Sequence, residues 1–350
     1  MLQQTVLTSR RKRRLSKTRQ VLAAIDTLLL IGLIFAVVAL VAHVLPNMHA
    51  SVPADSGDNS VASVPGDQRN AQTAVLLAKS AVTSQKPACQ SEYPSSEVAG
   101  LSIGDFSTTF PSADTGAGAL HNFQSDSLRI AITKVQQDHL CYFVADVWVR
   151  NISTFRTAFA KDTYGQGFRE STRTISAAHN AIFAVSGDYY GARSQGLVIR
   201  NGDLYRDRDD DSDVCTLFAD GQLKTYHNDA FQMSQAIAGG AYQGWSFGPE
   251  LLHDGRAIES FTKGIAQANP RCAIGYYDPG HYCFIVVDGR QKGYSDGMTL
   301  IQLSKTFYDL GCKSAYNLDG GQTAVMVFNG QVVNQPYNNG RSVSDIIYFS

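Results

Sequence analysis

Two aspartates directly follow short apolar stretches of the chain and stand beside glycines, in the segments AVSGDYYG and YNLDGGQT. They are Asp188 and Asp319. A carboxylate just beyond a buried strand, next to glycines that let a ligand or another backbone segment approach, is a frequent arrangement of catalytic groups. For one such segment alone a simple turn is the better interpretation, because Asp and Gly also form turns. The presence of two such segments favours a pair of catalytic carboxylates.

Three arginines in turn-like segments could complete a site of this kind. Arg271 lies in NPRCAIG, Arg290 in DGRQKG and Arg341 in NNGRSVSD. A guanidinium group presents paired N–H donors that match a phosphate or a carboxylate, although most surface arginines are simply solvated. Carboxylates together with guanidinium groups are what an anionic sugar substrate requires.

The other clusters of polar residues give weaker signals. The segment DRDDDSD has the alternate aspartates of a calcium loop, but Val214 replaces the required glycine and no glutamate closes the loop. The eight histidines show no zinc-ligand spacing. We therefore expect no metal and no cofactor. Glu250, in FGPELL, is a further candidate for a catalytic carboxylate; the alternative is a structural or solvated role.

Five Asx-Gly pairs separate alternating apolar segments along the second half of the chain. Such pairs predict hairpin turns, because their residues accept the positive φ angles of tight turns. Antiparallel sheet is therefore expected to dominate. The pairs are Asn201-Gly202, Asp220-Gly221, Asp254-Gly255, Asp288-Gly289 and Asn329-Gly330.

Two helices are expected, over residues 171–180 and 300–310. The second has capping-box spacing at Thr299 and Gln302, and it ends before Gly311, which suits a left-handed cap. Each helix leads into a short apolar strand that ends at one of the two aspartates. The predicted fold class is α+β, with an antiparallel-rich β-sheet, hairpins and a few packed helices.

The N-terminal segments predict a membrane anchor ahead of this domain. Residues 10–19 contain seven arginines and lysines, and residues 21–45 are almost wholly apolar, which is about the length needed to cross a bilayer. By the positive-inside rule, residues 1–20 are expected in the cytoplasm and the C-terminal domain outside the cell. The sequence after the span is a poor cleavage site, so we predict an uncleaved, single-pass signal anchor in the cell membrane.

The segment after the predicted span differs in composition from the rest. Residues 46–97 are rich in Ser, Ala, Pro, Asp and Gln and nearly lack aromatic residues, which predicts a disordered stalk. Residues 98–350 are expected to form a single domain. The formal net charge of −1 over 350 residues gives no general attraction to nucleic acid.

Six cysteines would lie outside the cell, where disulfides can form. Cys272 and Cys283 flank the segment DPGH, so a hairpin there would bring them opposite each other, and we expect a bridge between them. The other pairings stay open, as do free buried thiols.

Several segments in a fixed order carry a resemblance to a known family. They are SGDYYG, FGPELLHDG, RCAIGYY and the long run from IVVDGRQKGYSDG through AYNLDGGQTA to NNGRSVSD. Over roughly residues 165–350 the chain resembles the phosphodiester glycosidase domain family, which includes N-acetylglucosamine-1-phosphodiester α-N-acetylglucosaminidases and bacterial exopolysaccharide biosynthesis proteins. Two positions depart from the family pattern: Ser186 stands where NGD has asparagine, and Gln322 replaces a glycine of NLDGGGSS.

The resemblance implies hydrolysis of the anomeric C–O bond of a sugar-1-phosphodiester in a surface glycan. It implies that Asp319 and Asp188 assist the developing oxocarbenium ion, and the assignment of their separate roles stays open, as does retention or inversion at the anomeric carbon. Arg271 and Arg341 would hold the phosphate, with Arg290 behind them. The loop around the site and its hydrogen bonds would come from Asn317, Gly320, Gly321 and Thr323.

Two other functions are compatible with the same residues. A non-catalytic protein that binds cell-wall polyanions or polysaccharides would need the arginines but not the carboxylates. A transferase that moves the sugar to another acceptor would use the whole site and exclude water.

Overall fold

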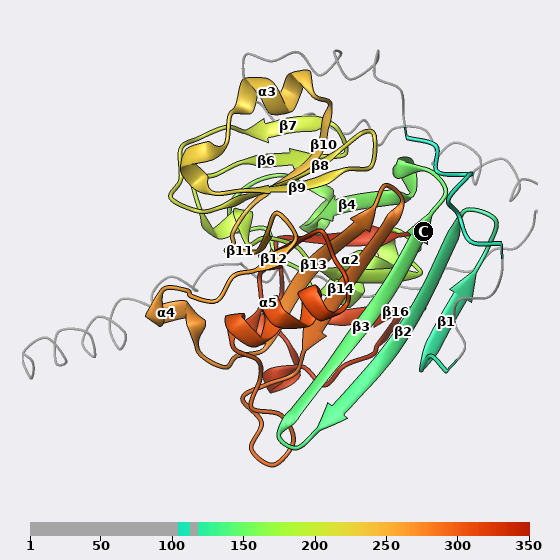
Figure 1. The fold of residues 1–350 in the computed structure, drawn as a ribbon, viewed down its shortest axis with the longest axis vertical. Coiled ribbons are helices and arrows are strands. Elements are labelled where there is room, and N and C mark those ends of the chain that lie inside the picture. Colours follow the sequence, from blue (N-terminus) through green and yellow to red (C-terminus); the bar gives the residue numbers. More distant parts are fainter. Residues whose placement is uncertain (1–103, 113–117) are drawn as a thin grey trace, which may run out of the picture. The chain divides into compact units, whose positions relative to one another are not determined.

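The computed structural model describes residues 104–112 and 118–350, and Figure 1 shows their arrangement. The predicted cytoplasmic segment 1–20, membrane anchor 21–45 and stalk 46–97 lie outside the described residues. Within the part that is described, no helix is long and apolar enough to cross a membrane.

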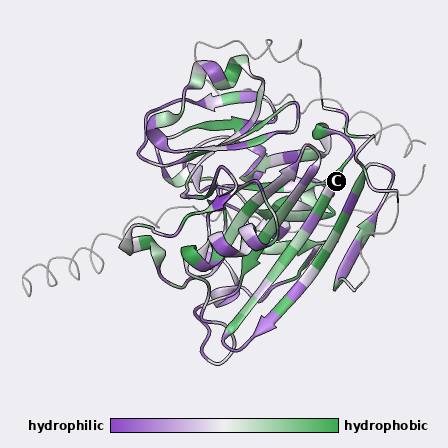
Figure 2. Cartoon of the chain, in the orientation of Figure 1, coloured by the Kyte–Doolittle hydropathy of each residue, from purple (hydrophilic) through white to green (hydrophobic). Residues whose placement is uncertain are grey.

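An eight-stranded antiparallel sheet forms the largest layer, in the order β1-β2-β3-β14-β13-β15-β11-β12. Residues of β3 alternate between fully and partly buried, as expected for a strand with one face on the core, whereas β13 and β14 are buried along most of their length. Figure 2 shows hydrophobic and hydrophilic residues interspersed along β3. The strands are β1 (His121–Gln124), β2 (Leu128–Gln137), β3 (Leu140–Val149), β11 (Glu250–His253), β12 (Arg256–Ala257), β13 (Arg271–Asp278), β14 (His281–Val287) and β15 (Ser314–Leu318).

Two five-stranded sheets complete the β-structure, and every strand pairing in them is antiparallel. One has the order β7-β6-β10-β8-β9, with β6 (Val198–Arg200), β7 (Asp203–Arg206), β8 (Val214–Phe218), β9 (Leu223–Tyr226) and β10 (Ala241–Ser246). The other has the order β17-β16-β5-β18-β4, with β4 (Phe155–Phe159), β5 (Phe183–Ser186), β16 (Met326–Phe328), β17 (Gln331–Val332) and β18 (Asp345–Phe349).

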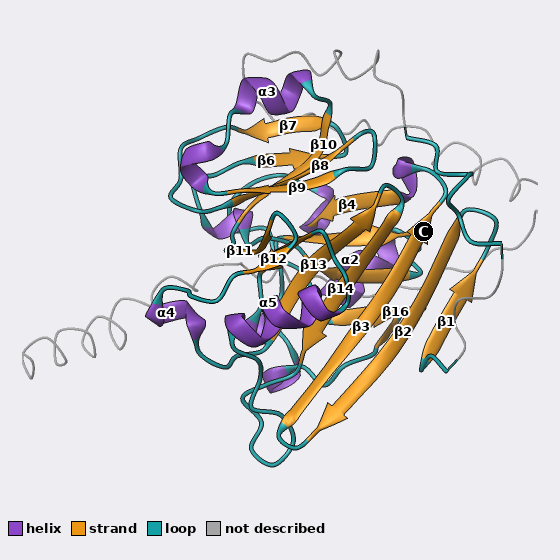
Figure 3. Cartoon of the chain, viewed as in Figure 1, coloured by secondary structure: helices purple, strands orange, loops and turns teal. Residues whose placement is uncertain are grey.

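Helices are few and short, as Figure 3 shows, so the predicted antiparallel-rich α+β character is confirmed for the described residues. The α-helices are α2 (Thr172–Ala178), α3 (Met233–Ala238), α4 (Lys263–Ala266) and α5 (Leu300–Asp309). The 3-10 turns are η3 (Ile152–Thr154), η4 (Ala160–Asp162), η5 (Tyr190–Ala192), η6 (Asn228–Ala230), η7 (Gly321–Thr323) and η8 (Tyr337–Asn339).

The predicted helix signals are correct. Ser171 caps α2 by accepting a hydrogen bond from the backbone N–H of Thr174. At α5, Thr299 and Gln302 form the reciprocal capping box, and Gly311 follows the helix with φ of 83°. These local contacts define both ends of α5, which packs across the eight-stranded sheet in Figure 1.

Four of the five predicted hairpin turns are correct, and the fifth is wrong. The Asx-Gly pairs at residues 201, 220, 254 and 329 join successive antiparallel strands. The pair at Asp288 does not, because β14 ends there and its partners are β3 and β13. Asp288 is instead almost fully buried, and it accepts hydrogen bonds from Asn334, Gln335 and Tyr294.

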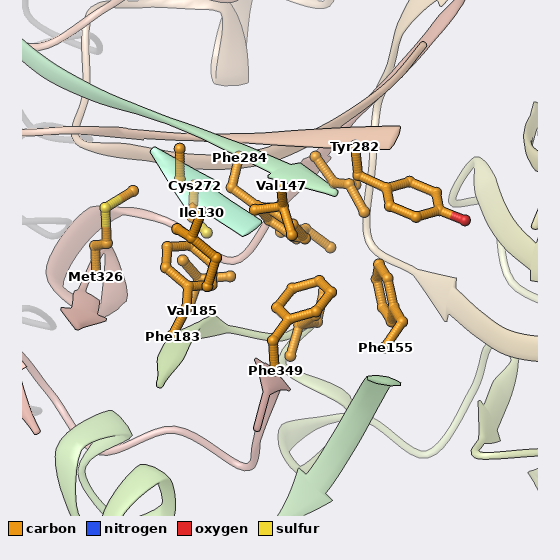
Figure 4. Packing of buried hydrophobic residues seen from close by; sticks show 14 of the residues in the cluster. Ile130, Val147, Phe155, Phe183, Val185, Cys272, Tyr282, Phe284, Met326 and Phe349 are labelled. Atoms are coloured by element: carbon orange, nitrogen blue, oxygen red, sulfur yellow. The ribbon is translucent and has the colours of Figure 1, made fainter. Parts of the chain in front are cut away.

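The main hydrophobic core lies between the eight-stranded sheet and the sheet that contains β5 and β18. Figure 4 shows Phe284 of β14 facing Phe183 of β5 and Phe349 of β18. The ring centroids of Phe183 and Phe284 are 5.4 Å apart, and those of Phe155 and Phe349 are 4.9 Å apart. Each such side chain contributes roughly 2 kcal/mol or more on burial. This cluster therefore fixes β5, which precedes Asp188, and β18.

The expected bridge between Cys272 and Cys283 is wrong. β13 and β14 do form a hairpin at DPGH, but their register pairs Cys272 with Val286 and Cys283 with Gly275. Side chains alternate between the two faces of a strand, so the two thiols belong to different hydrophobic clusters. The Sγ atom of Cys283 lies 3.8 Å from that of Cys312, and the five cysteines within the described residues are free thiols.

Replacing Gly275 by alanine is expected to destabilise the fold by about 1 to 3 kcal/mol, because it overpacks the hydrophobic cluster that contains Phe307 and Cys312. An added Cβ would lie 2.6 Å from the Cδ1 atom of Phe307 and 2.9 Å from the Sγ atom of Cys312. Urea unfolding of Gly275→Ala measures the effect. Gly264→Ala is the matched control, because an added Cβ there meets nothing within 4 Å. Equal stability of both variants would contradict the prediction.

Candidate active site

The ends of three strands, one from each sheet, meet around Asp319. Asp319 follows β15, and its backbone N–H donates a hydrogen bond to the carbonyl of Gly187, which follows β5, with an N–O distance of 3.0 Å. The Ser186 hydroxyl donates to the carbonyl of Asp319. The Asn317 side chain donates to the carbonyl of Gly248, after β10, with an N–O distance of 2.7 Å. The two predicted aspartate segments are thus neighbours in space.

Asp319 is a nearly buried carboxylate with a cation beside it. Its exposed fraction is 8%, and its Oδ2 atom lies 3.7 Å from a guanidinium nitrogen of Arg341. Burial raises the pKa of Asp319 to about 6, against the opposing effects of a hydrogen bond from Thr323 and the charge of Arg341. A carboxyl with a pKa in this range can exchange a proton near neutral pH.

Asp188 is more enclosed, and its oxygens are already engaged. Its exposed fraction is 1%, and Oδ1 forms an ion pair with Arg200 at 2.9 Å. The backbone N–H groups of Tyr190 and Ser246 donate to Oδ1 and Oδ2, respectively. Because both oxygens of Asp188 already have partners within the protein, we interpret Asp188 as a structural residue. Asp319 is the carboxylate nearer the surface.

Arg200 of β6 joins Asp188 to a third carboxylate, Asp345, which begins β18. Its guanidinium group lies 2.9 Å from each carboxylate, and it also donates to the carbonyls of Ile199 and Gly244. Burial raises the pKa of Asp345, and the charge of Arg200 opposes that rise. Neither Arg200 nor Asp345 is among the site residues predicted from the sequence. The signals available were an arginine inside the apolar strand VIR and the aspartate that ends NNGRSVSD.

Gly187 is required by this network. A Cβ atom at this position would lie 2.5 Å from the Cγ atom of Asp345. The glycine next to Asp188 thus allows the close approach of another backbone segment, β18, which is one of the two roles expected for such glycines from the sequence.

Arg341 is half exposed and lies beside Asp319. Its side chain is 42% exposed, and its guanidinium carbon lies 5.5 Å from the centre of the Tyr189 ring. Arg193 contributes further positive charge near Asp319, although its NH1 group donates to Ser212 and to the carbonyl of Ser246. Of the three predicted arginines, Arg341 is the one that the structure brings to Asp319.

Arg271 and Arg290 have other contacts. Arg271 is 8% exposed, and its Nε and NH2 groups donate to the carbonyls of Met298, Ile265 and Gln267. Burial and the nearby charge of Arg290 lower the pKa of Arg271 to about 10. The Arg290 guanidinium donates to the side-chain oxygen of Asn269. We therefore place neither residue in contact with the Asp319 carboxylate.

The glycines after Asp319 serve the packing of two backbone segments. The Gly321 N–H donates to the carbonyl of Pro270, and the φ angle of Gly321 is 61°. A Cβ at Gly320 would lie 2.8 Å from the same carbonyl oxygen. Thr323 closes η7 by donating its hydroxyl to the carbonyl of Gly320. Gln322, which replaces a family glycine, fits in this turn with a φ angle outside the positive range.

Glu250 begins β11 and is 5% exposed. It accepts a hydrogen bond from the Thr225 hydroxyl at 2.5 Å, and it borders a cavity of about 430 Å³ together with Asp213. Among the described residues, no group of three or more His, Cys, Asp or Glu side chains is placed to hold a metal ion.

Arg341 also lines a larger cavity, of about 610 Å³. The start of α2, the chain after β17 and residues 339–342 form its walls. Arg341 therefore borders both this cavity and the Asp319 carboxylate.

The part of the chain that carries this centre matches a known family. Residues 179–350 match the sequence model of the phosphodiester glycosidase family, and they include Asp188, Arg200, Asp319, Arg341 and Asp345. The resemblance to phosphodiester glycosidases is confirmed. The match starts after α2, so β1 to β4 lie outside it.

A curated relative and two solved structures are similar to this chain. The SPbeta prophage-derived uncharacterized protein YomE of Bacillus subtilis (strain 168) is 29% identical over 180 residues, which cover 49% of this chain and 28% of that protein. The chain thus spans under a third of the length of that curated relative.

The solved structures share the fold. The zebrafish N-acetylglucosamine-1-phosphodiester alpha-N-acetylglucosaminidase catalytic domain, auto-inhibited by its pro-peptide, has a TM-score of 0.53 at 19% identity, over 66% of this chain and 85% of that one. A hypothetical protein from Synechocystis has a TM-score of 0.51 at 14% identity, over 66% of this chain and 64% of that one. At these identities the likeness concerns the fold.

Proposed function

We propose that the chain hydrolyses the anomeric C–O bond of a sugar-1-phosphodiester, of the N-acetylglucosamine-1-phosphodiester type. The observation that carries this proposal is the pairing of the nearly buried Asp319 carboxylate with the Arg341 guanidinium, 3.7 Å away, inside the segment that matches the glycosidase family. A phosphodiester needs a cation, and a developing oxocarbenium ion needs a carboxylate. This pair offers both groups side by side.

The proposed roles follow from exposure and charge. Arg341, which is half exposed, binds the phosphate of the substrate, and Asp319 faces the anomeric carbon. The phosphate monoester is already a good leaving group, so the reaction needs little general-acid assistance. Asp188 acts as a positioning residue, because its oxygens are bound by Arg200 and by two backbone N–H groups.

The natural substrate is proposed to be a surface glycan or exopolysaccharide that contains sugar-1-phosphate links. This follows from the predicted signal anchor over residues 21–45, which would hold the domain on the outer side of the cell membrane. The anchor itself stays a prediction. Protease protection of intact cells, with an epitope at each end of the chain, would test the orientation.

The reaction is tested by incubating the full-length chain with UDP-N-acetylglucosamine and with N-acetylglucosamine-1-phosphomethyl ester, and by measuring free sugar. Arg341→Gln is expected to raise KM by about 10- to 100-fold, since a hydrogen bond to a charged group contributes about 1.5 to 3 kcal/mol. Arg256→Gln, an exposed arginine of β12, is the matched control.

Other outcomes would contradict this assignment. A change in Arg341→Gln no larger than in Arg256→Gln would remove Arg341 from the phosphate site. Transfer of the sugar to added glycerol without release of free sugar would indicate a transferase. Binding of both compounds without turnover would indicate a binding protein.

A further inference from the structure

The cavity of about 610 Å³ beside Arg341 has no part in the reaction as described so far. Its twelve lining residues include two arginines, Arg173 and Arg341, and no carboxylate. Several of the others carry hydroxyl or amide groups, among them Ser171, Ser342 and Asn334. A volume of this size is typical of a small-molecule site, and the charge of its lining favours an anionic ligand.

Arg173 is held in place without its charge being neutralised. Its Nε group donates to the carbonyl of Gly330, at 2.9 Å, and within the described residues no carboxylate forms an ion pair with it. Its side chain is anchored to the turn between β16 and β17 and borders the cavity. The rest of its guanidinium group can therefore donate to a ligand.

A second observation concerns Thr172, which lines the same cavity and is 2% exposed. Its hydroxyl has no hydrogen-bond partner in the described part of the protein. Buried hydroxyl groups normally have partners, so this one leaves a polar group unsatisfied beside the cavity; its oxygen is almost fully covered, so the anionic character of the ligand rests on Arg173 and Arg341.

The order of atoms in the substrate connects this cavity to the reaction. In a sugar-1-phosphodiester the anomeric carbon, the phosphate and the alcohol-derived group, or aglycone, follow one another. With the anomeric carbon at Asp319 and the phosphate at Arg341, the aglycone continues away from Asp319. Arg341 both lies beside Asp319 and lines the cavity, so a phosphate bound by Arg341 would have the cavity within reach of its aglycone.

We propose that this cavity binds the aglycone and that Arg173 selects an aglycone with a phosphate group of its own. The inference rests on the proposed hydrolase function and adds a substrate class to it. The substrates are then phosphodiesters of a phosphorylated alcohol, such as one repeat of a polyol-phosphate chain, rather than of a neutral alcohol. Arg173 acts as a specificity residue and takes no part in bond cleavage.

The test uses two substrates that differ in one group. They are N-acetylglucosamine-1-phosphoglycerol and the same compound with a second phosphate on its glycerol. The wild-type, full-length chain is expected to hydrolyse the second compound with a kcat/KM about tenfold higher, since a charge-assisted contact contributes at this level. Arg173→Gln is expected to lose this preference, with the loss confined to the phosphorylated compound, while Arg256→Gln keeps it.

Two results would overturn the inference while leaving the hydrolase function in place. One is equal kcat/KM of the wild type for the two compounds. The other is an equal loss on both compounds in Arg173→Gln. Release of sugar from neither compound would count against the proposed function itself.

A direct binding measurement tests whether the cavity is an anion site without relying on catalysis. Inorganic pyrophosphate is titrated into the wild-type chain at low salt, and its Kd is measured by calorimetry. We expect Kd to rise about tenfold in Arg173→Gln and to stay unchanged in Arg256→Gln. An unchanged Kd in Arg173→Gln, or no binding to the wild type, would overturn the assignment of the cavity as an anion site.

Discussion

Replacing Asp319 by asparagine is expected to lower the rate of sugar release by at least about 10²-fold, while the folded protein becomes more stable near pH 7. The variant keeps the shape of the side chain, removes its charge and replaces one acceptor oxygen by an amide N–H donor. Sugar release from the N-acetylglucosamine-1-phosphodiester and urea unfolding at pH 7 measure the two effects.

The gain in stability follows from the raised pKa of Asp319. Its ordinary pKa is 3.8, and burial raises it to about 6 in the folded protein. A raised pKa contributes stability that is fully present below pH 4 and is lost as the pH rises through about 6. The Asp319→Asn variant would not suffer that loss, so it is expected to be about 1 to 3 kcal/mol more stable at pH 7 and equal to the wild type near pH 4.

The same pKa shapes the expected pH profile of the enzyme. If ionised Asp319 supports the oxocarbenium ion, kcat/KM falls as the pH drops below about 6. Asp209→Asn, in the exposed acidic loop, is the matched control for both measurements. A stable Asp319→Asn variant with unchanged turnover would remove Asp319 from the reaction, and a variant that binds but does not turn over would confirm its role.

Replacing Arg200 by glutamine is expected to destabilise the protein by about 3 to 5 kcal/mol. The Arg200 guanidinium lies 2.9 Å from both Asp188 and Asp345, and all three side chains are at most 2% exposed. Removing one member of a buried ion network leaves uncompensated charges in a low-dielectric interior. Thermal or urea unfolding measures the loss, with Arg256→Gln as the exposed counterpart.

The pH dependence of the loss distinguishes a charge effect from a packing effect. Without Arg200, the pKa of Asp345 rises further, so the variant regains stability as the pH falls and this carboxyl takes up a proton. Arg200→Lys, which keeps a cation, is expected to lose less than Arg200→Gln. A loss that is the same at pH 5 and pH 8, and the same in both variants, would indicate packing alone.

Local signals in the sequence predicted the local structure well. The capping box at Thr299 and Gln302 and the cap at Gly311 depend on residues within one or two turns, and they set the limits of α5. Four Asx-Gly pairs formed their hairpins for the same reason. The hairpin predicted at Asp288 does not form, because the carboxylate of this residue accepts hydrogen bonds from residues more than 40 positions away.

The candidate site could be predicted only in part. Asp319 and Asp188 follow apolar strands, which a sequence pattern can detect. The third member of this network could not be placed from the pattern, because the ion pair between Arg200 and Asp345 joins two sheets across 145 residues. The register of β13 and β14 likewise depends on the whole sheet, so the spacing of Cys272 and Cys283 was misleading.

The position of β18 has a consequence for the time at which the site can form during synthesis. β18 comprises Asp345–Phe349, and it lies between β5 and the edge strand β4. Until these residues have emerged, β5 and β4 lack their common neighbour, Arg200 lacks one of its two carboxylates, and Phe349 is missing from the core. A growing chain that already contains Asp319 therefore still has an incomplete site. Loss of the β18 residues would leave such a chain permanently in that state.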